Sequence, residues 1–165
     1  MKRLLVFLLC ASAVFLSCKD NQIGSALTSA EISMNDNPES SLEILESIDR
    51  DLLSTRKQKA KFALLYSMAL DKNYIDIKTD SIIAPAVIYY ENHGAKEERF
   101  LCNYYHARIY ENCGDKENAL LCAIKAESVD TSKVSSQSKY LLYALKGRIY
   151  QQEWRFHESI EAYIL

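Results

Sequence analysis

Apolar and small side chains recur at helical spacing on both sides of a short polar turn in the middle of the chain. The turn is Cys113-Gly114-Asp115, within the segment 99–130. The recurring positions are Tyr104, Ala107 and Tyr110 before it, and Ala119, Ala123 and Ala126 after it. Gly114 can adopt the left-handed conformation that ends a helix, and Asp115 can cap the next helix. The pattern predicts two amphipathic helices whose facing alanines allow close antiparallel contact.

Helical spacing continues on both sides of this central pair. The other expected helices are 25–34, 39–48, 53–71, 81–92, 139–152 and a last one that includes 158–163. No alternation of apolar and polar positions persists along the chain, as a half-buried strand would require. The expected fold class is therefore all-α, an array of about four antiparallel helix hairpins.

The central pair resembles the tetratricopeptide repeat (TPR), a helix hairpin of about 34 residues. The residues that carry the resemblance are Ala107, Tyr110, Gly114, Asp115, Ala119, Ala126 and Val129-Asp130. The early tryptophan and the closing proline of the repeat are absent, and Thr131 stands at the place of the proline. The resemblance implies a right-handed α-solenoid over residues 25–165, apparently truncated within its last repeat. It also implies that Tyr66, Tyr110 and Tyr150 occupy equivalent packing positions.

The first 17 residues have the composition of an export signal. Lys2-Arg3 precedes an apolar run from Leu4 to Leu16 that is too short to span a bilayer comfortably. Ser17 followed by Cys18 resembles the processing site of a bacterial lipoprotein, where cleavage before the cysteine is followed by lipidation. We expect a signal peptide at 1–17, a lipidated Cys18, a tether over 18–24 and a membrane-anchored location in the cell envelope. The alternatives are an ordinary secretory signal cleaved nearby and a retained anchor.

Charge and motif content argue against several functions. The formal net charge is −2 and no basic stripe is present, so nucleic-acid binding is not expected. The sequence has no Gly-rich phosphate loop, zinc-protease motif or nucleophile elbow, and we expect no catalytic residue, no cofactor and no enzyme activity. Cys102 and His106 have the i, i+4 spacing of metal ligands, but two further ligands would be needed. No metal site is expected, and Cys102, Cys113 and Cys122 are expected to pack as small apolar residues.

The TPR resemblance implies that the first helix of each hairpin lines a concave surface that binds a protein or peptide. The residues expected there are Tyr104, Arg108, Glu111, Arg148 and Gln151. Arginine side chains beside a tyrosine suit a peptide carboxylate or an acidic segment. The alternative is that both arginines are solvated and paired with Glu111 and its neighbours.

Two other functions are alternatives, and the first of them is implied by a more specific resemblance. Segment 61–74 with the helix around 80–85 is similar to the sensor portions of repeat-containing bacterial regulators, whose transmembrane and DNA-binding parts are not in this sequence. Outer-membrane nutrient-capture lipoproteins also use repeat-like helix pairs. We expect a lipid-anchored helical-repeat protein that binds a protein or peptide partner, with these two functions as the alternatives.

Overall fold

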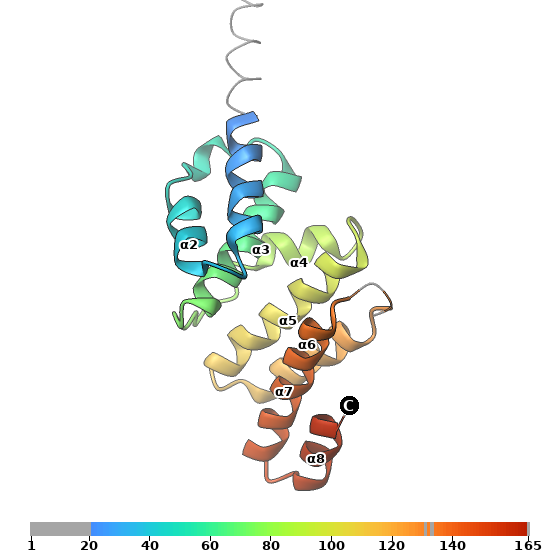
Figure 1. Cartoon of the computed structure of the whole chain (residues 1–165). Coiled ribbons are helices and arrows are strands. Elements are labelled where there is room, and N and C mark those ends of the chain that lie inside the picture. Colours follow the sequence, from blue (N-terminus) through green and yellow to red (C-terminus); the bar gives the residue numbers. More distant parts are fainter. Residues whose placement is uncertain (1–20, 131, 133, 165) are drawn as a thin grey trace, which may run out of the picture.

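A computed structural model describes residues 21–130, 132 and 134–164, and these residues contain α-helices and no strand (Figure 1). The first helix covers residues 21–33. The helices that follow are α2 (Pro38–Glu46), α3 (Arg56–Lys72), α4 (Ala84–Tyr90), α5 (Lys96–Asn112), α6 (Lys116–Glu127), α7 (Ser136–Gln152) and α8 (Phe156–Ile164), with a short 3-10 helix, η1, at Arg50–Leu52. The all-α fold class is therefore confirmed.

Each helix packs against its neighbours in the sequence. The most extensive contacts join α5 to α6, α7 to α8 and α3 to α4, while α3, α5 and α7 also contact one another in succession. Figure 1 shows the helices following one another along the molecule, from the first helix at one end to α8 at the other. One side of the molecule is thus formed by α3, α5 and α7.

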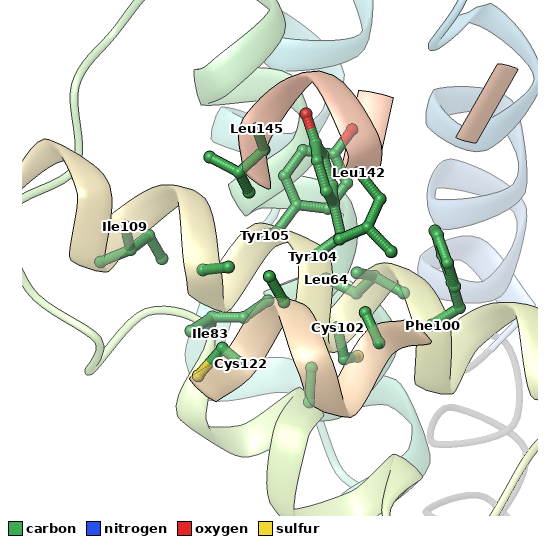
Figure 2. Packing of buried hydrophobic residues seen from close by; sticks show 14 of the residues in the cluster. Leu64, Ile83, Phe100, Cys102, Tyr104, Tyr105, Ile109, Cys122, Leu142 and Leu145 are labelled. Atoms are coloured by element: carbon green, nitrogen blue, oxygen red, sulfur yellow. The ribbon is translucent and has the colours of Figure 1, made fainter. Parts of the chain in front are cut away.

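Two groups of apolar side chains form the core. The larger group joins α3 to α7, and Figure 2 shows Leu64, Ile83, Tyr105, Cys122 and Leu142 converging within it. The smaller group packs the first helix against α2 and α3. Small residues at the contact between α5 and α6 are fully buried, as the sequence predicts: Ala107, Ala119, Ala123 and Ala126. They let two helix backbones approach closely while larger side chains fill the space between successive pairs.

Side chains that satisfy free backbone N–H groups begin several of the helices. Asp115 Oδ1 accepts a hydrogen bond from the Asn118 N–H at 3.1 Å, which confirms the predicted cap of α6. Thr55 and Gln58 form a reciprocal capping box at the start of α3. Helix α7 starts at Ser136, three residues before the expected start at 139, because the Ser135 hydroxyl caps it by accepting from the Ser138 N–H. The connection that precedes α7 is therefore shorter than a start at 139 would make it.

Two further boundaries differ from expectation. Helix α4 covers Ala84–Tyr90 and not 81–92, because Pro85 lies in its first turn and residues before it form turns. Residues 21–24, expected to belong to a tether, are helical, and Ile23 is buried against the N-terminal part of the core. The helix extends this far because Ile23 continues the apolar face of Leu27 and Ala30.

The same left-handed turn ends α3, α5 and α7. Its central residues are Tyr74, Gly114 and Trp154, with φ of 59°, 76° and 61°, and they lie 40 residues apart. In each turn the N–H of the next residue donates to a carbonyl five positions earlier: Ile75 to Leu70, Asp115 to Tyr110 and Arg155 to Tyr150, all at 2.9 Å. This is the Schellman pattern of helix termination. Leu70, and not Tyr66, is therefore equivalent to Tyr110 and Tyr150, so the predicted equivalence of Tyr66 is wrong.

Glycine suits this turn, and two of the three positions carry aromatic residues. A left-handed conformation costs a non-glycine residue about 1–2 kcal/mol, partly offset by the larger entropy that glycine loses on folding. We predict that Tyr74→Gly and Trp154→Gly each raise the free energy of unfolding by about 0.5–1 kcal/mol in urea titrations.

The reverse change provides the control. A Cβ atom on Gly114 would meet no atom within 4 Å, so Gly114→Ala tests the backbone conformation alone. We expect it to lower the free energy of unfolding by about 1–2 kcal/mol. Equal stability of all three variants and the wild type would contradict the shared turn.

Candidate functional site

A chain of charged side chains crosses α3, α5 and α7 on one face of the molecule. Asp71 Oδ1 accepts from Arg108 Nε at 3.0 Å and lies 2.9 Å from Arg108 Nη2. Arg108 also pairs with Glu111 on the same helix. Glu111 accepts from Arg148 Nε and Nη2, each at 3.1 Å. We call these four residues the charge ladder, and their face the inner face.

The middle of the charge ladder is shielded from water and its end is open. Only 9 % of the Glu111 side chain is exposed, whereas 43 % of the Arg148 side chain is. Burial lowers the pKa of the Arg108 guanidinium, but the charges of Asp71 and Glu111 outweigh this effect and raise it overall. Arg108 is therefore held as a cation by two carboxylates of the chain itself, and Arg148 is the arginine whose side chain is exposed enough to reach a ligand.

Tyr104 lies beside the charge ladder without taking part in it. Its side chain is buried, and burial with the charge of Asp71 raises its pKa to about 12, although Arg108 and Arg148 act in the opposite direction. The phenol is neutral at physiological pH. Figure 2 shows Tyr104 and Tyr105 together between α5 and the α7 residues Leu142 and Leu145.

Two adjoining cavities lie on the inner face next to the charge ladder. One has a volume of about 320 Å³ and lies over the end of the first helix, α3 and the start of α5. The other, of about 230 Å³, extends to α7 and is lined in part by Tyr104 and Leu141. Both are lined by Asn35, Met68, Glu97 and Leu101. We call the two cavities together the groove.

Helical spacing places the groove and the charge ladder on one continuous surface. Met68 and Asp71 are three residues apart on α3, and Leu101 and Arg108 are seven apart on α5, so each pair shares a helix face. The apolar part of this surface is formed by flexible methionine and leucine side chains. Such side chains adapt to different ligands, and methionine is frequent at surfaces that bind several partners.

The structure brings together three of the five residues predicted to bind a partner. Arg108, Glu111 and Arg148 form most of the charge ladder, and both guanidinium groups contact the same carboxylate, so they lie on one side of the molecule. Their pairing with Glu111 is the alternative that the sequence left open. Tyr104 is buried beneath this surface, and Gln151 is exposed outside the ladder. Cys18 lies outside the described residues.

Sequence reasoning missed Asp71. This residue lies 40 positions before Glu111, as Arg108 lies 40 before Arg148, so the turn spacing could have found it. This spacing is difficult to detect in the sequence, because Tyr74 and Trp154 are not residue types that commonly end a helix. Only Gly114 is.

Comparison with known proteins gives no relative: neither a protein-family model, nor a curated protein, nor a solved structure matches this chain.

The charge ladder predicts unequal effects of its members on stability. Glu111→Gln keeps the shape of the side chain but removes the charge that two arginines share, and we expect it to lower the free energy of unfolding by about 2 kcal/mol. Arg148→Ala should lower it by less than about 1 kcal/mol, because this side chain is more exposed. Urea titrations measure both changes.

An exposed pair gives the matched control. Arg155 and Glu158 pair at 2.9 Å on the surface, and Arg155→Gln should change the stability by a few tenths of a kcal/mol. If Glu111→Gln had no larger effect than this control, the ladder would not hold the helices together.

Cys102 and His106, which share metal-ligand spacing, have different surroundings. Burial raises the pKa of the Cys102 thiol, as does the charge of Glu98, which keeps the thiol protonated. The His106 ring lies 4.6 Å from the Tyr110 ring, and its Nε2 is 4.0 Å from Asp80 Oδ2. Among the described residues, no group of three or more potential metal ligands is found. Cys102 and Cys122 are buried as free thiols, as predicted, whereas Cys113 is exposed.

His106 predicts a pH dependence of stability. Burial lowers its pKa below the ordinary value of 6.5, although Asp80 acts against this effect. As the pH falls below about 6.5, the unfolded state binds a proton that the folded state resists, so stability decreases. We expect the His106→Phe variant, which keeps the ring contact with Tyr110, to lose less stability than the wild type when the pH falls from about 7.5 to about 5.5, which is one pH unit on either side of the unfolded value of about 6.5. Equal losses in urea titrations would contradict this assignment.

Proposed function

We propose that this protein binds a segment of another protein along its inner face, as a TPR-like stack of helix hairpins. The observation that carries the proposal is the groove, which crosses the first helix, α3, α5 and α7 and adjoins the charge ladder. A surface formed by equivalent faces of successive helices suits an extended segment, because one segment can contact several helices in turn. The groove supports binding rather than any particular chemistry.

The lining of the groove indicates what such a segment would offer. Apolar side chains would contact Met68 and Leu101, which line both cavities. A carboxylate, from an acidic side chain or a chain terminus, would approach the exposed guanidinium of Arg148. Arg108 is less available, because Asp71 and Glu111 occupy its hydrogen-bonding groups. The proposed segment is therefore apolar with a carboxylate towards α7.

The location belongs to the same proposal. Cys18 after the apolar N-terminal run supports export and lipidation, which would hold the helical part near a membrane through a short link. Acylation on more than one chain gives stable attachment, whereas a single chain is marginal. No helix within the described residues is long and apolar enough to cross a membrane.

A change in the groove tests the binding proposal. Peptides would be selected from a random library for binding to the full wild-type chain. Their affinities would then be measured for the wild type and for the Leu101→Glu variant. A charge in the apolar part of the groove should weaken binding by about tenfold or more, the equivalent of about 1.4 kcal/mol. Ile88→Glu is the matched control, because Ile88 is exposed on α4 outside the groove. Equal weakening by both variants, or by neither, would place the binding surface elsewhere.

The anchor has its own test. Mass spectrometry of the protein extracted from membranes should show an N-terminal peptide that starts at an acylated Cys18. Cys18→Ser should remove both the acyl mass and the processing. A mature N-terminus away from Cys18, without lipid, would contradict the lipoprotein proposal and leave the groove proposal intact.

A further inference from the structure

Two aromatic side chains project from the turns that end α3 and α7. Tyr74 is 95 % exposed and Trp154 is 80 % exposed, and both have left-handed backbones that glycine adopts at Gly114 in the equivalent turn. Each has an exposed apolar neighbour, Ile75 and Phe156, and the rings of Trp154 and Phe156 lie 5.8 Å apart. Tyr74 and Trp154 are thus exposed aromatic residues at positions where the left-handed backbone conformation favours glycine.

These aromatics do not serve the folded state. A side chain that is almost wholly exposed buries little apolar surface, and the left-handed backbone opposes its presence. Glycine would satisfy the same turn, as Gly114 does. Strained positions that packing does not require point to contacts outside the chain.

The arrangement of the turns suits a flat partner. Figure 1 shows the turns after α3, α5 and α7 along one side of the molecule, from the left of the view down to its lower end. We call residues 72–78, 112–117 and 152–157 the turn edge. Its aromatic side chains protrude from convex turns on both sides of the bare Gly114 turn. A cavity of about 500 Å³ lies between the Gly114 turn and the Trp154 turn. The exposed aromatic side chains of Tyr74 and Trp154 project from the turns themselves, and a plane can touch several protruding turns at once.

The net charge of the turn edge indicates which kind of flat surface it suits. The turn edge carries four basic and four acidic residues, so its net charge is zero. Lys116 and Arg155 pair with Glu153 and Glu158, each at 2.9 Å. Lys72 lies at the first turn, and a long basic side chain can extend to the polar layer of a bilayer. Tryptophan and tyrosine are enriched at the membrane–water interface. A neutral edge would gain little from an anionic surface, which attracts basic segments.

We propose that the turn edge rests in the interfacial layer of a zwitterionic lipid bilayer, with Tyr74 and Trp154 inserted. The inference rests on the proposed membrane attachment, which would keep the edge at high local concentration beside the bilayer. It adds a second contact that orients the molecule relative to the bilayer. It does not depend on what the groove binds.

Trp154 is the only tryptophan of the chain, so its fluorescence reports on this contact directly. The full chain, purified from membranes with the N-terminus that it carries there, would be reconstituted into phosphatidylcholine vesicles. Vesicles with bromine atoms high on the acyl chains should quench Trp154, and a quencher dissolved in water should quench it less than in detergent. Neither effect should change with added salt, because the edge is neutral.

Variants separate insertion from folding. Tyr74→Gly should be at least as stable as the wild type, yet it should lower the docked population by about tenfold, because one inserted ring is lost. Tyr140→Ala is the matched control: Tyr140 is also highly exposed but lies outside the turn edge, and quenching should be unchanged.

Three results would overturn the inference. Trp154 that is quenched fully from water and not by lipid would show that the edge faces solvent. Quenching by lipid only in anionic vesicles would show that the edge binds a charged membrane surface and not a zwitterionic one. Protection of Trp154 that rises with protein concentration in detergent would show that a second copy covers the edge. The mass of the N-terminal peptide is measured on the same sample, so a missing lipid at Cys18 is recognised separately from a failure of the edge to insert.

Discussion

The left-handed turn that ends α3, α5 and α7 is the constraint on which the rest of the structure depends. It stops each helix at an equivalent residue, and its three occurrences lie 40 residues apart. Side chains at equal distances from the turn therefore face the same side of the molecule. Arg108 meets Glu111 on its own helix and Asp71 on α3 because the turns set the registers of these helices, and Arg148 meets Glu111 for the same reason.

The charge ladder and the groove complement each other on the inner face. Ion pairs hold α3, α5 and α7 together at the end nearest the turns. Further along the same helices, Met68 and Leu101 leave apolar surface that the chain does not cover. One end of this surface has paired charged groups, and the other end is apolar and accessible. Such a surface can bind an elongated ligand in a single orientation. This asymmetry is the physical basis of the proposed function.

Much of this fold could be predicted from the sequence, because helical periodicity is strong and the helix pair 96–127 carries ordinary signals. Gly114 and Asp115 end one helix and begin the next as predicted, and the alanines of that pair are buried. The exact register of the other pairs could not be predicted, because Tyr74 and Trp154 take a conformation that their chemistry disfavours. Pairing Tyr66 with Tyr110 shifted α3 by one helical turn, so Asp71 was overlooked. The groove could not be predicted, since it depends on how side chains from four helices pack.

The measurement that tests the central claim most directly is photo-crosslinking in intact cells. A photoreactive amino acid would replace Leu101 in the groove or Ile88 on α4 of the membrane-bound protein, and crosslinked peptides would be identified by mass spectrometry. The proposal predicts one recurring partner segment at position 101, rich in apolar residues and carrying a carboxylate, which is absent at position 88. Crosslinks of equal yield and identity at both positions, or none at position 101, would contradict binding along the inner face.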